Sequence, residues 1–249
     1  MREKMIEGTK PSLSLIVTAY NEAPIIEDCV QTCIAGLAAQ FTDYELILIN
    51  DASTDATGQI IDTLAEAHPT TIKAFHNATN LNMGASIRRG MKEATKGYVT
   101  FNAADLPFDP SKYADIINQA PDADMIVVQR IKYKGTTSWR RLSSLFNRAI
   151  MKILFPKLKG KIKDTNYFQI TKKAALPQIM PQSQGPIFTW PEMIFTARYK
   201  GMNVVTVDAE YNPKHERKGA FGKPKDITQA LVEMLRFRLR LWSRKIPKL

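Results

Sequence analysis

The first 130 residues alternate short apolar runs with longer stretches of helical periodicity, and this alternation restricts the fold more than any other feature. The pattern predicts strands at 13–17, 46–49, 98–101 and 125–128, and helices at 25–40, 55–67 and 84–94. Strands separated by helices form parallel sheets through crossover connections. The sequence therefore predicts an α/β domain with a mainly parallel sheet and helices on both faces.

Three of the predicted strands end in clusters of polar residues, at 18–22, 50–55 and 102–105. Ligands of open α/β sheets bind beyond the carboxyl ends of the strands, so these clusters are expected to form one site. The chain has neither a Walker-type phosphate loop nor a GxGxxG segment. The phosphates of a nucleotide ligand would therefore be held by a metal ion or by basic side chains.

The second half of the chain is less regular. Helices are predicted at 138–155, 191–200 and 226–245, a strand at 168–171, and a polar loop at 211–225. No apolar run reaches the length of a membrane-spanning helix and the first residues lack a secretory apolar core, so a cytoplasmic protein is expected. Two cysteines, Cys29 and Cys33, are too few for a zinc site and are interpreted as structural.

Charge is distributed unevenly along the chain. Residues 1–130 hold 10 basic and 17 acidic residues, whereas residues 131–249 hold 25 and 7. This asymmetry favours an anionic partner for the second half, such as a membrane surface or a phosphorylated substrate, with a solvated cationic face as the alternative. No nucleic-acid recognition motif is present, so nucleic acid is not among the expected partners.

Four segments carry the functional signal: VTAYNE at 17–22, NDASTDAT at 50–57, NLNMGASIR at 80–88 and NAADLPFDP at 102–110. In this order they resemble the P-x-Y-N-E, D-D-G-S-T-D-G-T, N-x-G-x-G-A-x-x-R and D-x-D motifs of family 2 glycosyltransferases, above all the polyprenyl-phosphate (dolichyl-phosphate) mannose and glucose synthases. The resemblance covers about residues 10 to 225. It implies a GT-A domain over residues 1–225, with a nucleotide-sugar half at about 10–110 and an acceptor half at 111–225.

The resemblance also implies a donor site. Its nucleotide-sugar contacts would be Thr18, Tyr20, Glu22, Asn50, Asp51, Asn82, Arg88 and Ala104. Asp51 stands where an acidic side chain of the family meets the base. Asp105 aligns with the second carboxylate of D-x-D, which holds Mg²⁺ or Mn²⁺, whereas Ala103 replaces the first. A single carboxylate can hold such a cation together with water and diphosphate, and a turn residue before Pro107 is the alternative for Asp105.

Three basic residues are expected to neutralise the diphosphate and to form the catalytic set with Asp105. They are Arg130, and Arg217 and Lys223 in a segment that resembles the R-x-x-G-x-S-K loop of the family. A solvated loop is the alternative for Arg217 and Lys223.

The acceptor side is less well matched. Asp164 to Gln169 resembles D-T-x-x-G-F, and Glu192 lies at the F-x-x-E segment without the paired acidic residues of saccharide-acceptor members. A phosphate acceptor is an anionic nucleophile that needs no base, so the sequence favours inverting hexose transfer to a membrane polyprenyl phosphate. A saccharide acceptor remains an alternative, as does a non-catalytic membrane-binding protein, which Ala103 suggests.

Residues 226–249 alternate arginine with large apolar residues, from Leu235 to Trp242 above all. Such a helix resembles a surface-lying anchor on anionic membranes, which would place the chain peripherally on the inner face of a membrane. A helix packed on the domain with a solvated basic side is the alternative.

Overall fold

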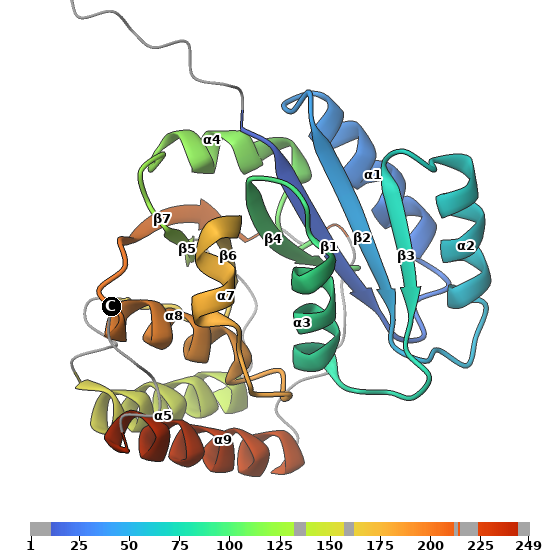
Figure 1. Cartoon of the computed structure of the whole chain (residues 1–249). Helices are drawn as coiled ribbons and strands as arrows, with labels where there is room; N and C mark the ends of the chain where they lie inside the picture. The colour runs from blue at the N-terminus through green and yellow to red at the C-terminus, as the bar shows by residue number, and fades with distance from the viewer. Residues whose placement is uncertain (1–10, 132–137, 157–161, 212–213, 215–223, 244–249) are drawn as a thin grey trace, which may run out of the picture.

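The computed structural model describes residues 11–131, 138–156, 162–211, 214 and 224–243. These residues form one seven-stranded sheet in the order β3-β2-β1-β4-β6-β5-β7 (Figure 1). The strands are β1 Leu13–Ala19, β2 Tyr44–Asn50, β3 Ile72–His76, β4 Tyr98–Ala103, β5 Met125–Ile131, β6 Phe168–Lys172 and β7 Val204–Glu210. Strand β6 is antiparallel to β4 and β5, and the other neighbours pair in parallel, which confirms the predicted mainly parallel sheet.

Helices cover both faces of this sheet. They are α1 Ile26–Ala38, α2 Thr57–Ala67, α3 Met83–Glu93, α4 Tyr113–Asn118, α5 Ser138–Leu154, α7 Leu176–Ile179, α8 Thr189–Tyr199 and α9 Pro224–Trp242, with short 3-10 turns η1 Pro110–Lys112 and η2 Lys173–Ala175. One hydrophobic core lies between the sheet and α1, α2 and α4, and a second lies between the sheet and α3, α5, α8 and α9. Both faces of the central strands are therefore buried.

Strand β1 illustrates how the sequence produces this arrangement. Leu15 and Val17 enter the first core, whereas Ile16 enters the second. A strand buried on both faces needs a continuous apolar run rather than an alternating one, and residues 13–17 are such a run with one serine. The serine, Ser14, is buried and donates its hydroxyl to Glu45 of β2 at 2.7 Å.

The cysteines also lie in the first core. Cys29 and Cys33 are buried free thiols on α1, in agreement with the structural interpretation. The pKa of the Cys29 thiol is raised by its hydrogen bond to Cys33, by burial and by the nearby charge of Asp105.

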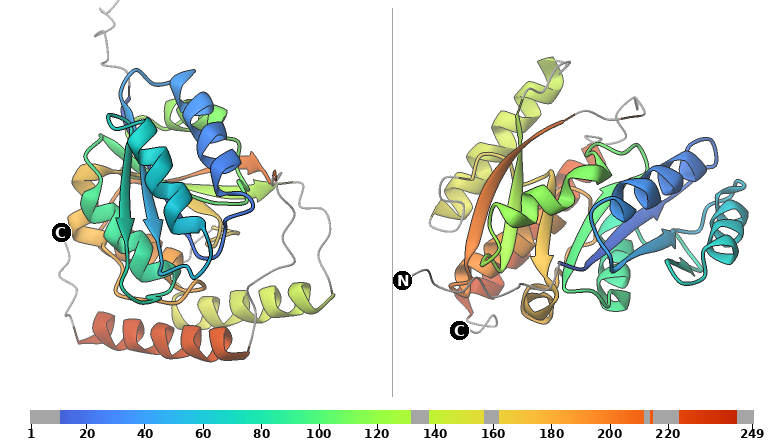
Figure 2. Two further views of the ribbon diagram at one scale, coloured as in Figure 1. Left: turned by 90° about the vertical axis from the view of Figure 1, so that its right-hand side faces the viewer. Right: turned by 90° about the horizontal axis from the view of Figure 1, so that it is seen from above.

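The two basic helices α5 and α9 lie side by side below α8 in Figure 1, on the side of the second core (Figures 1 and 2). Helix α9 inserts Met234, Phe237 and Leu241 into the second core, where Phe237 meets Phe155 at a ring-centroid distance of 5.5 Å. The helix is thus packed on the domain and is an integral part of its core. Within the described ranges, no helix has the length and apolar character that crossing a bilayer requires.

Candidate functional site

The polar clusters that follow β1, β2 and β4 meet at one edge of the sheet. In the register of the sheet, Thr18 pairs with Ala103, and Ala19 pairs with Asn50. The clusters continue this pairing, because the Asp51 N–H donates to the Ala19 carbonyl at 2.9 Å and the Asn77 N–H donates to the Asn50 carbonyl at 2.9 Å. The expectation that the clusters share one edge is therefore confirmed.

Asp51 is the centre of a buried network on this edge. Its Oδ1 atom accepts a hydrogen bond from Asn77 Nδ2 at 2.7 Å and another from the Leu81 N–H at 2.9 Å. Asn77 also donates to Ser86 on α3 at 2.9 Å and accepts from Arg89 at 2.6 Å. Asp51 thus fixes the loop between β3 and α3. Asn77 is a buried organiser of the site that the motif comparison does not identify.

The loops after β1 and β2 brace each other. The Asn21 N–H donates to Ser53 Oγ at 3.0 Å, and the Thr54 N–H donates to Asn21 Oδ1 at 2.8 Å. The Glu22 N–H donates to Thr57 Oγ1 at 2.8 Å. The Asp55 carboxylate accepts hydrogen bonds from Thr57 and from the Ala23 N–H. It therefore joins the loop after β2 to the loop after β1. Tyr20 lies exposed beside this junction.

Backbone strain is concentrated at the same edge. In the described ranges, the non-glycine residues with positive φ are Asn21 at 56°, Ala52 at 60°, Asn82 at 67° and Leu106 at 48°. Each follows a different strand among β1 to β4. Left-handed backbone costs free energy for residues with a Cβ atom and gathers at functional sites. The strain is consistent with loops shaped for a ligand.

Ala52 offers a direct test of this strain. Replacing Ala52 with glycine should increase the free energy of unfolding by about 0.5–1 kcal/mol, because relief of the left-handed conformation outweighs the added flexibility of the unfolded chain. Ala35, exposed in the middle of α1, is the matched control, since glycine there should lower the free energy of unfolding by about 1 kcal/mol. Urea denaturation measures both. A loss of stability in both variants would contradict the positive φ at Ala52.

Asp105 provides a carboxylate beyond β4. It lies half-buried on a turn that the Leu106 N–H closes onto the Ala103 carbonyl at 2.9 Å, next to the buried Ala104. The Lys214 N–H donates to the Leu106 carbonyl at 3.3 Å, so the chain after β7 returns to this turn. Arg217 and Lys223, which follow Lys214, lie outside the described residues.

The predicted metal ion can be tested against these groups. Asp51 and Asp55 are engaged with loop N–H and side-chain donors, and the described part of the chain contains no cluster of three or more metal-ligating residues. Asp105 is the carboxylate that lies at the end of β4, where the motif would hold a cation. Mg²⁺ is often bound by one or two carboxylates together with substrate phosphates and water, and Mn²⁺ also prefers oxygen ligands. The residues fit a cation that arrives with a diphosphate.

Two predicted basic residues have protein partners. The Arg130 guanidinium on β5 binds the Asp164 carboxylate at 2.5 and 3.2 Å and lies over the rings of Tyr167 and Tyr211. Arg88 on α3 donates to the carbonyls of Pro181 and Ser183 at 3.0 and 3.3 Å. Arg88 thereby holds the segment before α8, and its contact with a donor stays a prediction, as does that of Arg130.

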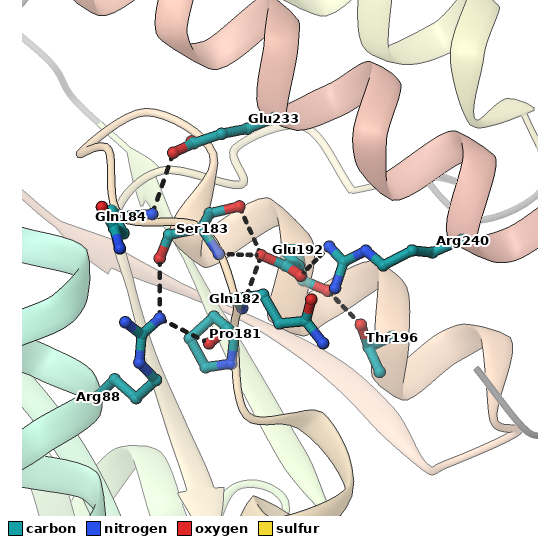
Figure 3. A network of polar contacts seen from close by, with 9 residues as sticks. All are labelled: Arg88, Pro181, Gln182, Ser183, Gln184, Glu192, Thr196, Glu233 and Arg240. Atoms are coloured by element: carbon teal, nitrogen blue, oxygen red, sulfur yellow. Dashed lines mark hydrogen bonds and ion pairs between the residues drawn. The ribbon is translucent and has the colours of Figure 1, made fainter. Parts of the chain in front are cut away.

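Glu192, in the segment where saccharide-acceptor relatives present a carboxylate, is buried on α8 (Figure 3). Its Oε2 atom accepts from the N–H groups of Gln182 and Ser183 and from Ser183 Oγ, at 3.1, 2.8 and 2.5 Å. Its Oε1 atom pairs with Arg240 of α9 at 2.5 Å. A carboxylate with these partners is unsuited to remove a proton from a hydroxyl group. Instead, Glu192 joins α9 to the segment that contacts α3.

The comparison with known proteins agrees with the motifs. The model of the family described as "Glycosyl transferase family 2" matches residues 14–179. The uncharacterized glycosyltransferase YibD of Escherichia coli K12 is 37% identical over 120 residues, which are 47% of this chain and 33% of that protein. The uncharacterized glycosyltransferase EpsJ of Bacillus subtilis 168 is 28% identical over 130 residues, 52% of this chain and 36% of that protein. The chain spans about a third of the length of these curated relatives.

Solved structures agree on the fold. Glucosyl-3-phosphoglycerate synthase from Mycobacterium tuberculosis, in complex with Mn²⁺, UDP-glucose and phosphoglyceric acid, has a TM-score of 0.67 at 17% identity, covering 92% of this chain and 80% of that one. Mannosyl-3-phosphoglycerate synthase from Rubrobacter xylanophilus has a TM-score of 0.64 at 15% identity, covering 94% and 75%. The sheet order, the strand-end site and a family model that matches more than half of the residues lead to one conclusion: this chain belongs to glycosyl transferase family 2.

Proposed function

We propose that the chain transfers a hexose, with inversion, from a UDP- or GDP-sugar to a polyprenyl phosphate at the inner face of a membrane. The observation that carries this proposal is the joining of the strand-end clusters at one edge, with Asp51 beyond β2 and Asp105 beyond β4. Asp51 would meet the nucleotide base, in a loop fixed by Asn77. Thr18, Tyr20, Glu22, Asn50, Asn82 and Ala104 would line the rest of the donor site.

Catalysis would be mainly electrostatic. Asp105 would hold Mg²⁺ or Mn²⁺, which supplies positive charge to the diphosphate. Arg130, Arg217 and Lys223 would add charge as the nucleoside diphosphate leaves. Preorganised charges of this kind stabilise a developing anion without reorganising at the moment of reaction. The loops around Asp105 are well suited to this, because neighbouring segments fix them in strained conformations.

The hydrogen bonds and the ion pair of the Glu192 carboxylate favour an acceptor that is already anionic. This carboxylate is buried and saturated with donors, so it would not serve as the base that a neutral hydroxyl acceptor needs. A phosphate oxygen is a nucleophile without deprotonation. Glu192 therefore supports a phosphate acceptor over a saccharide acceptor.

Donor binding can be tested at Asp51. Asp51→Asn keeps an oxygen at the Oδ1 position to accept from Asn77 and Leu81, but it removes the charge. We expect UDP or GDP to bind about 10- to 100-fold more weakly, which corresponds to the 1–3 kcal/mol of a charged hydrogen bond. Calorimetric titration in the presence of Mn²⁺ measures the effect. Asp122→Asn, at an exposed aspartate in the loop before β5, is the control. If both variants bound UDP and GDP as tightly as the wild type, Asp51 would not contact the nucleotide and would only fix the loop.

The membrane part of the proposal is supported by the outer sides of α5 and α9. Most exposed large apolar side chains of the described chain lie there, namely Leu145, Phe146 and Ile153 on α5, and Val232, Leu235, Leu239 and Trp242 on α9. We call these seven residues the apolar face. Trp242 is 82% exposed and Ile153 is 77% exposed. Exposed cations accompany them, including Arg148, Lys152, Arg236 and Arg238, and in the described part of these two helices no carboxylate is exposed.

Substitutions on the apolar face test the membrane association without touching the core. The triple variant Leu235→Ser, Leu239→Ser and Trp242→Ser should lose most of its sedimentation with anionic vesicles, because the buried apolar area and the basic residues act together. Nucleotide binding should be unchanged, because the three side chains are exposed on α9 and none belongs to the strand-end clusters. Vesicles of zwitterionic lipid are the control surface. Equal sedimentation of the wild type and the variant would exclude this face as the membrane contact.

A further inference from the structure

Three consecutive carbonyl groups, those of residues 106–108, join the turn that carries Asp105 to the rest of the domain. The carbonyl of residue 106 accepts from the Lys214 N–H, after β7, at 3.3 Å. The carbonyl of residue 107 accepts from the Tyr167 hydroxyl, before β6, at 2.7 Å. The carbonyl of residue 108 accepts from Asn102 Nδ2, on β4, at 2.9 Å. Three separate segments of the chain therefore meet at this turn.

The turn depends on such partners because its backbone is strained. Leu106 has a φ of 48°, in the left-handed region that costs free energy for a residue with a Cβ atom. Residues in this conformation persist when the surrounding structure fixes them. Leu106 is buried in the first core, and its N–H closes the turn onto the Ala103 carbonyl at 2.9 Å. Loss of an outside partner should let the turn relax, and the Asp105 carboxylate, one residue before Leu106, would move with it.

The Tyr167 hydroxyl makes the shortest of the three hydrogen bonds, and the Tyr167 ring is fixed on several sides. The rings of Phe168 and Tyr211 meet it edge-on at centroid distances of 4.7 and 5.9 Å. The Arg130 guanidinium, which is paired with Asp164, lies 5.4 Å from the centroid of the ring. Burial raises the pKa of the Tyr167 hydroxyl, so at neutral pH it remains protonated and donates.

This tyrosine lies at the edge of the sheet where the donor clusters meet. Strand β6 is antiparallel to β4 and β5, and β5 is parallel to β7, so β4, β5 and β7 end at one edge. Tyr167 directly precedes β6, and its hydroxyl also lies 3.3 Å from the carbonyl of Glu210, the last residue of β7. Tyr167 therefore connects the turn after β4 to the ends of β5 and β7.

We propose that Tyr167 is a positioning residue of the transferase site: its hydroxyl holds the turn after β4 and thereby the Asp105 carboxylate. This inference rests on the proposed function, which assigns the divalent cation to Asp105. None of the motifs assigns a function to Tyr167. Its effect on the reaction would pass through Asp105, without contact between Tyr167 and the substrates.

Amide hydrogen exchange of the full chain without ligands, followed by NMR, tests this positioning. In Tyr167→Phe, we expect the Leu106 N–H to exchange about 3- to 10-fold faster than in the wild type, the effect of one lost hydrogen bond. The Asp51 N–H, at the end of β2, should exchange at the wild-type rate. Tyr98→Phe is the matched control, because the Tyr98 hydroxyl also donates to a proline carbonyl, that of Pro121 at 3.2 Å, but at the opposite end of β4. It should leave the exchange of the Leu106 N–H unchanged.

Binding of Mn²⁺ tests the consequence for Asp105. The cation is titrated in the presence of UDP, or of GDP if GDP binds more tightly, and its free fraction is measured by electron paramagnetic resonance. Tyr167→Phe should weaken Mn²⁺ binding about 3- to 10-fold, whereas Tyr98→Phe should bind like the wild type. Asp105→Asn should weaken binding more than Tyr167→Phe does, because it removes the charged ligand itself.

The other outcomes separate this inference from the proposed function. Wild-type exchange of the Leu106 N–H in Tyr167→Phe would overturn the inference, because the turn would then be held without the hydroxyl. Equal acceleration at Leu106 and Asp51 would also overturn it, since the variant would then be destabilised as a whole. Faster exchange at Leu106 with wild-type Mn²⁺ binding would show that the turn does not position the cation ligand, which again contradicts the inference. Wild-type Mn²⁺ binding by Asp105→Asn would instead contradict the proposed cation site, whichever result Tyr167→Phe gives.

Discussion

Asp105→Asn is expected to lower the rate of sugar transfer at saturating donor by about 100- to 1000-fold, the usual cost of removing one preorganised electrostatic group from an active site. The substitution keeps the size of the side chain but removes the charge that would hold the divalent cation. Ala103 makes the effect larger than in a site with two carboxylates, because the first position of D-x-D supplies no second ligand to the cation. Radiolabelled donor turnover at several Mn²⁺ concentrations measures it, and raising Mn²⁺ should restore part of the rate.

Asp109→Asn is the matched control for Asp105. Asp109 lies four residues later, is exposed, and accepts from Ser111 at the start of η1. Its substitution should leave transfer unchanged. Wild-type transfer by Asp105→Asn would show that Asp105 is only a turn residue before Pro107. The unfolding midpoint of both variants should equal that of the wild type, so a loss of rate cannot be ascribed to unfolding.

Arg240→Met is expected to lower the free energy of unfolding by about 3–5 kcal/mol, because it leaves the Glu192 carboxylate buried without its cation. The introduced methionine side chain fills much of the space of the arginine stem, so lost packing contributes little to this effect. Glu192→Gln in the same chain should restore most of the loss, because an amide removes the unpaired charge. Urea denaturation monitored by circular dichroism measures the two single variants and the double variant.

Arg238→Met is the control for Arg240→Met, since Arg238 is an exposed arginine two residues away on the same helix. It should change the free energy of unfolding by less than about 0.5 kcal/mol. If Arg240→Met were equally mild, the pair with Glu192 would not be a structural link. The same contacts predict that a chain ending at residue 235 unfolds, because it loses Phe237 and Leu241 from the second core.

The elements that the sequence predicts best are those whose pattern is local and strongly periodic. The predicted bounds of the helix at 55–67 and the strand at 98–101 differ by only two residues at one end from α2 and β4. A motif marks one end of each element: α2 begins where the NDASTDAT segment ends, and β4 ends within the NAADLPFDP segment. The strand ends are predictable for the same reason, because a run of buried residues stops where the polar motif begins.

Two edge strands cannot be delimited from the sequence, because their pattern is weak. β7 alternates buried Val207 and Ala209 with exposed Thr206 and Asp208, and it contains no continuous apolar run. β3 has five residues of which one is buried. Short strands at the edge of a sheet need little apolar surface, so composition distinguishes them poorly from loops.

The contacts that join distant segments are also beyond prediction. Glu192 and Arg240 are 48 residues apart, and Arg88 is 93 residues from Pro181. Nothing in the local sequence distinguishes Arg240 from Arg238, although one is paired in the interior and the other is exposed. The sequence allows two alternatives for the last helix: Met234, Phe237 and Leu241 pack on the core, whereas the contact of its exposed side with a membrane stays a prediction.

The proposed reaction of the chain is sugar transfer from a nucleotide donor to a lipid phosphate. Incubation of the full chain with radiolabelled UDP- and GDP-hexoses, Mn²⁺ and anionic vesicles that contain a polyprenyl phosphate tests it most directly. Parallel reactions contain an oligosaccharide or 3-phosphoglycerate in place of the lipid. We expect label from one donor to move into the organic phase only with the polyprenyl phosphate, and Asp105→Asn to abolish this movement. Label that moves only into the oligosaccharide or the phosphoglycerate, or that stays in the donor in every reaction, would contradict it.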